Sequence, residues 1–295
     1  PVRAVAVAPD GVVMAAIARE NRIVALPDRN ADGRADAALP FDGPDGYNNP
    51  SDLAFGSGYL WIANADGVTR VPYTPGDLEA SGPPETLIPL PAGGRNPGRA
   101  LVLDGEGRLY IGVGASCNAC RMTDPRLGAV LRLAVDGSDA VVYSRGMRAP
   151  YGLAVHPDTG ELWATDQARD DLGDAGPGDE LDRLIPGGDF GWPECFEDRR
   201  PDPEFGASSE RCLESIGPAA LLPPHQAPSG MAFHNGVMFP EDWRGDLLIA
   251  LFGSSTASLP TGHRVVRMPF EAGQPTGEIV DTASGWLRRD TRRWG

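Results

Sequence analysis

The feature that most constrains the fold is an internal repeat of short apolar strands. Each copy has a strand, a turn of the Pro-Asp-Gly type, a second strand, a polar turn and a third strand. Five copies begin at Val5, Pro50, Arg99, Pro150 and Pro228. One copy alone cannot bury both faces of so small a sheet, whereas copies packed around an axis can. The repeat therefore predicts an all-β fold of the β-propeller type, because a β-sandwich would not give this self-similarity.

The last part of the chain does not complete a further copy. Residues 286–295, which begin with Trp286, resemble the beginning of a sixth repeat. We therefore expect a propeller of six-bladed ancestry, with five clear repeats and an incomplete or atypical last blade. We expect residues 1–295 to form a single β-propeller domain, a length that one large β domain reaches.

The charge of the chain excludes several kinds of partner. The formal net charge is −15, which disfavours nucleic acid and anionic membranes. No apolar run approaches the roughly 18 residues that a membrane helix needs, so we expect no membrane span. All 26 residues counted as Lys or Arg are Arg, so a Schiff-base lysine is impossible. A neutral sugar or a cationic partner remains compatible with this composition.

The four cysteines fall into two local pairs. Cys195 and Cys212 bracket a loop rich in charge, Pro and Ser, and a disulfide between them would contribute about 3 kcal/mol. For Cys117 and Cys120, a disulfide and free thiols both remain open, while zinc is not expected because no second C-x-x-C and no H-x3-H segment follows. This even, local pairing indicates an oxidising compartment, so we expect a periplasmic or secreted protein. The start of the chain lacks signal-peptide features, which fits a mature form and equally a cytoplasmic protein.

One acidic loop has the spacing of a calcium loop. Its oxygen ligands would be Asp28, Asn30, Asp32 and Asp36. Gly33 occupies the sixth position, where the loop rule requires glycine, but Leu39 stands at the twelfth position in place of a bidentate Glu. The alternative is a polar turn between strands, because Asp, Asn and Gly favour turns.

A second acidic stretch covers residues 170–180. It ends with Asp179 and Glu180, two carboxylates that are candidates to bind Ca²⁺. The alternative is a solvated acidic loop without a ligand.

Several segments together match the motifs of one known family. Gly178-Asp-Glu-Leu-Asp, followed by Gly187-Gly-Asp-Phe-Gly-Trp-Pro, resembles the G-D-E-L-N…G-G-N-Y-G-W-P signature of the soluble PQQ-dependent sugar dehydrogenases. The segment that begins Gly146-Met-Arg-Ala-Pro-Tyr-Gly-Leu resembles their G-L-R-N-P-x-G-L. Ala115-Ser-Cys-Asn-Ala-Cys and Pro224-His-Gln-Ala-Pro-Ser-Gly point to the sorbosone dehydrogenase branch. The matches keep their order over most of residues 20–275.

The resemblance implies a quinone, PQQ, and a Ca²⁺ ion that bridges it to backbone carbonyls. A histidine base would take the proton of a sugar hydroxyl while hydride passes to the quinone. On this chain the implied contacts to the anionic quinone are Arg99, Arg148, Gln167 and Arg169. His225 matches a family histidine near the cavity and is the remaining candidate for an ionisable catalytic group, although a hydrogen-bonded turn histidine is an equal alternative.

The chain departs from the family pattern at several of these positions. The family's base lies in an H-x-x-R or H-x-G-R segment just before the third repeat, which here reads Gly94-Arg-Asn-Pro-Gly-Arg-Ala. Asn96 or Arg95 therefore occupies its place, and the usual catalytic His is missing. Ala149 replaces the Asn of the R-N-P motif. The L-H-G-S-W segment of the sorbosone branch reads Leu251-Phe-Gly-Ser-Ser. An amide is not a base near neutral pH, so these changes bear on the family's chemistry.

Two functions therefore stand side by side. The first is an oxidoreductase that passes hydride from an aldose or aldehyde to PQQ, with a divergent active site. The second is a non-catalytic propeller that binds protein partners as a subunit of an extracytoplasmic assembly. A calcium-dependent lactonase is a weaker third, because the sequence offers no convincing central set of carboxylates.

Overall fold

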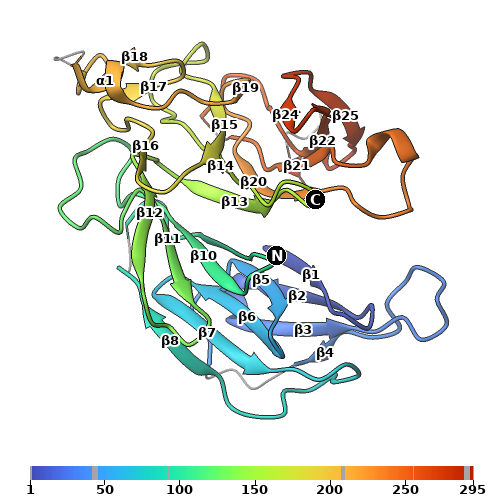
Figure 1. Ribbon diagram of the computed structural model, residues 1–295. Helices are drawn as coiled ribbons and strands as arrows, with labels where there is room; N and C mark the ends of the chain where they lie inside the picture. The colour runs from blue at the N-terminus through green and yellow to red at the C-terminus, as the bar shows by residue number, and fades with distance from the viewer. Residues whose placement is uncertain are drawn as a thin grey trace. The chain divides into compact units, whose positions relative to one another are not determined.

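The chain folds mainly into antiparallel β-sheet, in two compact units (Figure 1). The computed structural model describes residues 2–41, 46–91, 94–206, 210–254, 256–288 and 293–294. Unit 1 comprises residues 1–111 and 132–141, and unit 2 comprises residues 112–131 and 142–295.

Two four-stranded meanders form most of unit 1 (Figure 1). Each strand pairs antiparallel with the preceding one, and the tight turns between most of them are rich in Gly, Asp and Asn. The first sheet contains β1 (Ala4–Val7), β2 (Val13–Ile17), β3 (Arg22–Leu26) and β4 (Leu39–Pro40). The second sheet contains β5 (Asp52–Gly56), β6 (Tyr59–Asn64), β7 (Gly67–Pro72) and β8 (Glu85–Pro89).

An apolar core lies between these two sheets. Apolar residues from both sheets are fully buried in it, among them Met14, Ile23, Leu60 and Ile62. They alternate with residues on the opposite strand faces, as the period of two in a β-strand requires. This shared core explains why a single repeat cannot fold alone.

The third sheet contributes strands to both units. Its strands are β9 (Arg99–Leu103), β10 (Arg108–Val113), β11 (Ala129–Ala134) and β12 (Val141–Arg145). A short fifth strand, β16 (Gly188–Asp189), pairs in parallel with β12.

Two further four-stranded sheets belong to unit 2. The fourth sheet contains β13 (Pro150–Val155), β14 (Leu162–Asp166), β15 (Asp179–Leu184) and β19 (Ala220–Leu222). The fifth contains β20 (Pro228–Phe233), β21 (Leu247–Leu251), β22 (Arg264–Met268) and β25 (Val280–Ala283). The insertion between β15 and β19 carries β16, the pair β17 (Cys195–Phe196) and β18 (Arg200–Pro201), and helix α1 (Glu210–Glu214).

The two faces of the fourth sheet differ sharply. One face carries Trp163 and Leu181, which are fully buried against Leu247 and Ile249 of the fifth sheet. Because side chains alternate along a strand, the residues beside Trp163 and Leu181 lie on the opposite face. That opposite face carries the carboxylates of Asp166, Glu180 and Asp182.

The remaining elements are short. They are the 3₁₀ turns Ala18–Glu20 and Glu241–Trp243 and the pairs β23 (Phe270–Glu271) with β24 (Gln274–Pro275) and β26 (Leu287–Arg288) with β27 (Arg293–Trp294). No helix among the described residues is long and apolar enough to cross a membrane.

The architecture confirms the predicted all-β propeller fold with five blades. Residues 286–295, predicted to begin a sixth repeat, include β26 and β27, while residues 289–292 and 295 lie outside the described part of the chain. The six-bladed ancestry and the single domain stay predictions. The expected disulfide Cys195–Cys212 is present, and Cys117–Cys120 is also a disulfide, which settles the alternative left open by the sequence.

Candidate cation centre in unit 2

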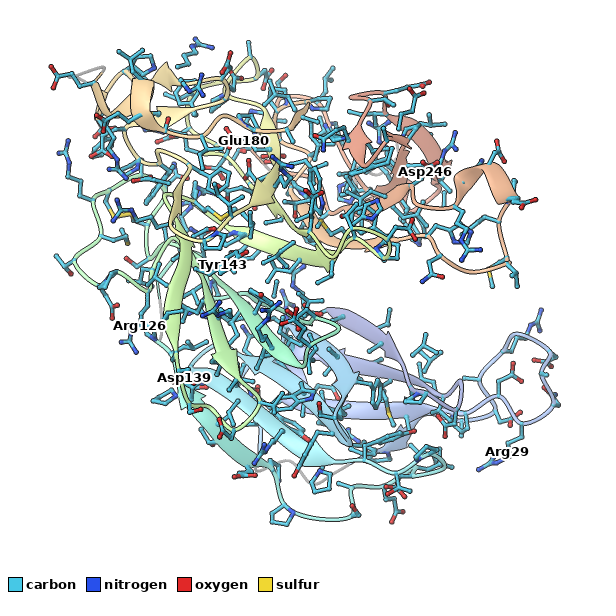
Figure 2. The ribbon with its side chains drawn as sticks, viewed as in Figure 1. Arg29, Arg126, Asp139, Tyr143, Glu180 and Asp246 are labelled. Carbon is cyan, nitrogen blue, oxygen red and sulfur yellow. A yellow bond between two sulfur atoms is a disulfide. The ribbon has the colours of Figure 1, made fainter. Side chains whose placement is uncertain are left out.

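Three buried carboxylates gather on the face of the fourth sheet opposite Trp163 and Leu181. Strands β14 and β15 are antiparallel, with Asp166 opposite Glu180 and Ala164 opposite Asp182. The three acidic side chains therefore share one face, and Figure 2 labels Glu180 on β15. One oxygen of each lies within 4.8 Å of the others. Across the described residues, no other three His, Cys, Asp or Glu side chains are grouped in this way.

The three buried carboxylates differ in the number of hydrogen bonds that they accept. Asp166 accepts hydrogen bonds from the backbone N–H of Arg148 at 2.8 Å and of Ala149 at 2.5 Å. Glu180 accepts one from the backbone N–H of Glu197 at 2.5 Å. Asp182 is 0% exposed, and neither of its oxygens has a hydrogen-bond partner among the described residues. A buried carboxylate without a partner requires a proton or a cation.

Burial changes the proton affinity of this cluster. It raises the pKa of Asp166 to about 6 against the opposing effect of its two backbone hydrogen bonds. It raises the pKa of Glu180 and of Asp182 well above the ordinary range, and the neighbouring carboxylates add to this shift. The cluster therefore retains protons near neutral pH in the absence of a cation, and a divalent cation would displace them.

A cavity of about 20 Å³ adjoins the cluster. Its lining includes Arg148, Asp166, Glu180, Trp192 and Asp202. This volume accommodates a water molecule or a single ion. Hard cations such as Ca²⁺ prefer carboxylate oxygens, so the donor set fits Ca²⁺.

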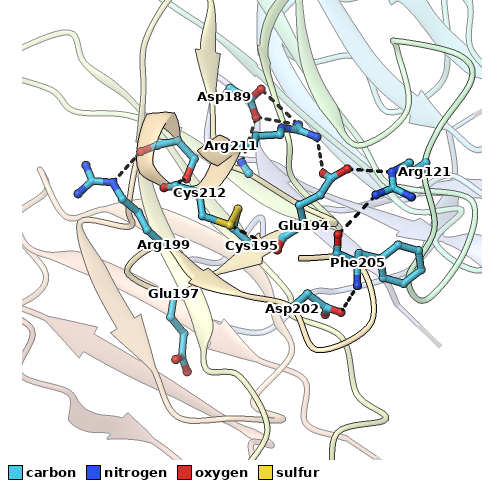
Figure 3. The surroundings of a disulfide bond; sticks show 12 residues. Arg121, Asp189, Glu194, Cys195, Glu197, Arg199, Asp202, Phe205, Arg211 and Cys212 are labelled. Atoms are coloured by element: carbon cyan, nitrogen blue, oxygen red, sulfur yellow. Dashed lines mark hydrogen bonds and ion pairs between the residues drawn. A yellow bond between two sulfur atoms is a disulfide. The ribbon is translucent and has the colours of Figure 1, made fainter. Parts of the chain in front are cut away.

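The insertion that borders the cavity is held by a disulfide and a group of charges (Figure 3). Arg211 of α1 contacts Glu194 and donates to Asp189 at 3.1 Å. Arg121 donates to the other oxygen of Glu194 at 3.0 Å. Cys195, the next residue along the chain, lines the cavity and pairs with a cysteine of α1. These contacts fix the wall of the cavity to neighbouring loops.

The sequence prediction for Asp179 and Glu180 separates into two cases. Glu180 joins the carboxylate cluster. Asp179 is its neighbour on the same strand and so points to the other face, where its carboxylate accepts hydrogen bonds from Ala168 and Ala227 at 2.9 and 2.8 Å. Burial raises the pKa of Asp179 to about 7. The structure therefore groups Glu180, and not Asp179, with the other acids.

Sequence reasoning missed Asp166 and Asp182. The available signal was Asp182 itself, which stands where the family signature has the amide of G-D-E-L-N. A carboxylate at this position, two residues from Glu180, falls on the same face of a strand. Asp166 ends the preceding strand and gave no comparable signal.

The predicted calcium loop at residues 28–36 lies in unit 1 and is exposed. Asp28 accepts from the backbone N–H of Asp32 and Gly33 at 3.1 and 2.8 Å, and Asp36 accepts from that of Arg29 at 2.9 Å. Asn30 accepts from the N–H of Asp32 and donates to its carboxylate, both at 3.1 Å. These oxygens accept hydrogen bonds from the backbone of the loop itself and so stabilise its turn. Cation binding at this loop stays a prediction.

Arg148 is 1% exposed and fully engaged inside unit 2. Its Nε donates to the carbonyl of Asn118 at 2.9 Å and its Nη2 to the side-chain oxygen of Asn118 at 2.6 Å. Its Nη1 donates to the carbonyl of Gln167 at 3.0 Å. The structure thus brings two of the predicted quinone contacts together, but with their polar groups directed to each other and to Asn118.

Arg169 is surrounded by carboxylates. Its guanidinium donates to Asp171, Asp202 and Glu204 at 2.7 to 3.2 Å. These hydrogen bonds raise the pKa of Arg169 above its ordinary value, and the one with Asp171 contributes most. Three acids around one cation leave this position negative overall.

Arg99 and Asn96 belong to unit 1. Arg99 is 2% exposed and donates to four backbone carbonyls, including that of Asn96 at 3.0 Å and that of Pro91 at 2.8 Å. Asn96 is buried as well. Arg99 therefore organises the backbone around it.

His225 connects loops of unit 2. It is buried, and its Nε2 lies 2.9 Å from the carbonyl of Gly173, which makes Nε2 the protonated nitrogen. Its Nδ1 lies 3.5 Å from the hydroxyl of Thr256. This arrangement matches the hydrogen-bonded turn histidine that the sequence left as an alternative. The Ser255 position of the L-H-G-S-W segment lies outside the described residues.

Sequence comparisons relate the chain to sugar dehydrogenases. A family model described as glucose/sorbosone dehydrogenase matches residues 87–274, more than half of the chain. The aldose sugar dehydrogenase YliI of Escherichia coli is 28% identical over 187 residues, covering 55% of this chain and 46% of that protein. An uncharacterized protein of Borreliella burgdorferi is 25% identical over 212 residues, covering 71% of this chain and 56% of that protein. The chain thus spans about half the length of these curated relatives.

Solved structures share the fold. A calcium structure of a carbohydrate-active enzyme from Trichoderma reesei has a TM-score of 0.79 at 17% identity, over 96% of this chain and 80% of that chain. The PQQ-bound aldose sugar dehydrogenase of Streptomyces coelicolor has a TM-score of 0.67 at 21% identity, over 98% of this chain and 83% of that chain. At these identities the likeness establishes a propeller of the PQQ type as the fold. The match to the family model, which covers most of unit 2, shows in addition that the chain belongs to the glucose/sorbosone dehydrogenase family.

Proposed function

We propose that the chain is a calcium-binding propeller of this family that binds a protein partner instead of oxidising a sugar through a quinone. One observation carries the proposal. By the resemblance, the position of the family's proton-accepting histidine is taken by Asn96 or Arg95, and neither side chain can accept a proton near neutral pH. General-base catalysis at that position is therefore lost.

The cationic residues support the same conclusion. A quinone with several carboxylates needs cationic donors that face it. In the described residues, the guanidinium groups of Arg99 and Arg148 donate to protein oxygens, and that of Arg169 donates to three carboxylates. Held in this way, the three arginines do not fit an anionic quinone.

Calcium, in contrast, fits the residues of unit 2. Asp166, Glu180 and Asp182 would hold the ion, and Asp182 would gain the partner that it lacks. The ion would neutralise three buried acids and join the ends of β14 and β15. We therefore assign Ca²⁺ a structural role that stabilises the fourth sheet.

The partner that we propose is a protein with a basic surface. The net charge of −15 favours such a partner, because opposite charges steer association. Two disulfides support an extracytoplasmic location, since reducing compartments disfavour them. A periplasmic or secreted assembly is therefore the proposed setting.

Quinone-dependent oxidation of an aldose or aldehyde is the second candidate. It is favoured by the family match and by the likeness to propellers whose structures contain PQQ. On this account, Arg148 would have to exchange Asn118 for the quinone, and another group would have to replace the missing base.

A dye-reduction assay separates the two candidates. The chain is incubated with Ca²⁺ and PQQ, and a panel of aldoses and aldehydes is added with an electron-accepting dye. We expect no sugar-dependent reduction by the parent chain. Asn96→His serves as a matched variant that restores a base at the same position. Sugar-dependent reduction by the parent chain would refute the proposal in favour of the second candidate.

A further inference from the structure

We propose that the Cys117–Cys120 disulfide positions the cation centre through Asn118 and Arg148, so that the affinity for Ca²⁺ depends on the thiol state of a surface loop. The inference rests on the calcium binding proposed above. It adds Asn118 as a positioning residue and a dithiol reductant as the regulating agent.

The first link is the disulfide loop itself. Cys117 and Cys120 are joined across only two residues, Asn118 and Ala119. Asn118 offers Arg148 both its backbone carbonyl and its side-chain oxygen, at 2.9 and 2.6 Å. The Asn118 amide also hydrogen-bonds Asp171. Closure of so short a loop restricts the backbone of Asn118, so both acceptors are held toward Arg148.

The second link runs from Arg148 to the cation centre. The backbone N–H of Arg148 donates to Asp166, and the next residue, Ala149, donates to the second oxygen of Asp166. The carbonyl of Arg148 accepts from the N–H of Ala115, which lies just before the disulfide loop. The segment that orients Asp166 is therefore attached to the loop through both its backbone and its guanidinium group.

The two disulfides differ in access. Cys195 and Cys212 are 2% and 1% exposed, whereas Cys117 and Cys120 are only partly buried. A dithiol reductant therefore reaches Cys117–Cys120 first. The reductant transfers two electrons and two protons, the S–S bond breaks to give two cysteine thiols, and the reductant becomes a cyclic disulfide.

Reduction should weaken the centre without unfolding the sheet. Partners that orient a metal ligand contribute about 10- to 100-fold to metal affinity when they are removed. Because the backbone hydrogen bonds to Asp166 can persist in part, we expect the low end, about tenfold weaker binding of Ca²⁺.

The test uses the full chain in three states: oxidised, reduced with dithiothreitol, and reoxidised. Mass spectrometry after alkylation confirms that only Cys117 and Cys120 have been reduced. Calorimetric titration with CaCl₂ then measures affinity. In parallel, hydrogen–deuterium exchange of the calcium-free chain follows the amides of Arg148 and Ala149.

Variants separate positioning from general damage. Cys117→Ser with Cys120→Ser, and Asn118→Ala, should each reproduce the reduced state. Ser116→Ala is the matched control, because Ser116 is an exposed neighbour of the loop whose hydroxyl donates to the sulfur of Met122 at 3.6 Å. Its calcium affinity and its exchange rates should equal those of the parent.

We expect reduction to weaken calcium binding about tenfold and to accelerate exchange at Arg148 and Ala149, both reversibly. If reduction accelerated exchange but the chain bound no calcium, the disulfide would still be shown to position Arg148 and Ala149, and the proposed calcium binding would be rejected. Unchanged exchange on reduction, or unchanged affinity in a chain that does bind calcium, would overturn the inference.

Discussion

Replacing Asp182 by Asn should stabilise the calcium-free protein and weaken its response to calcium. Asp182 is completely buried, and its two oxygens have no hydrogen-bond partner among the described residues. An unsatisfied buried polar group costs about 1–3 kcal/mol, and a charge costs more. The amide of Asn can donate to the neighbouring carboxylates of Asp166 and Glu180. We therefore expect Asp182→Asn to raise the free energy of unfolding by about 2 kcal/mol in chelator at pH 7.5.

The calcium response moves in the opposite direction. Calcium at a hundred times the Kd stabilises a protein by about 2.7 kcal/mol. Loss of one of three carboxylates should weaken binding at least tenfold, which leaves about 1.4 kcal/mol at the same concentration. For a unit of this size, each kcal/mol changes Tm by roughly 2–4 °C.

Thermal unfolding with and without CaCl₂ measures both effects. Asp158→Asn is the matched control, because Asp158 is an exposed residue of the turn between β13 and β14. It should behave like the parent in both conditions. The reasoning would be refuted if Asp182→Asn were less stable than the parent in chelator, or if it kept the full calcium response.

Three further predictions concern stability. Burial raises the pKa of Asp52 to about 6, so its favourable contribution to the free energy of unfolding is present at low pH and lost as pH rises through that value. Relative to Asp52→Asn, the parent should lose about 1 kcal/mol of this free energy between pH 5 and pH 7.5 in urea titrations. A difference between the two proteins that stays constant over this pH range would contradict the prediction. Trp163→Ala should lower the free energy of unfolding by about 3–5 kcal/mol because Trp163 is fully buried, and a loss below 1 kcal/mol in the same titration would argue against the packing described. Replacing Cys195 and Cys212 by Ser should lower it by about 3 kcal/mol, measured against the oxidised parent, whereas an unchanged midpoint would show that the loop is held without the bond.

The strands of this fold were predictable because their signals are local. The Pro-Asp-Gly turns and the short apolar runs between them mark the strands and their ends without knowledge of distant residues. The pairing of Cys195 with Cys212 was predictable for the same reason, since the two cysteines bracket one loop. The disulfide between Cys117 and Cys120 was not predictable, because a C-x-x-C segment is compatible with free thiols and with a disulfide.

The candidate site was predictable only in part. The sequence singled out Glu180, but its neighbour Asp179 points away because consecutive residues of a strand face opposite sides. A solvated loop was one of the two interpretations of residues 170–180, yet Glu180 at the end of this stretch is buried. The sequence also cannot show which acceptors surround a guanidinium. Arg169 meets Asp202 only because an insertion folds back over thirty residues later.

As proposed above, this chain should bind calcium but not PQQ. Calorimetry follows a titration of the chain first with CaCl₂ and then with PQQ, and the absorbance spectrum of the quinone is recorded in parallel. We expect a calcium isotherm in the first titration, and neither heat nor spectral change as PQQ reaches high micromolar concentration in the second. Tight, calcium-dependent binding of PQQ would refute the proposal and would mean that Arg148 exchanges its internal partners for the cofactor.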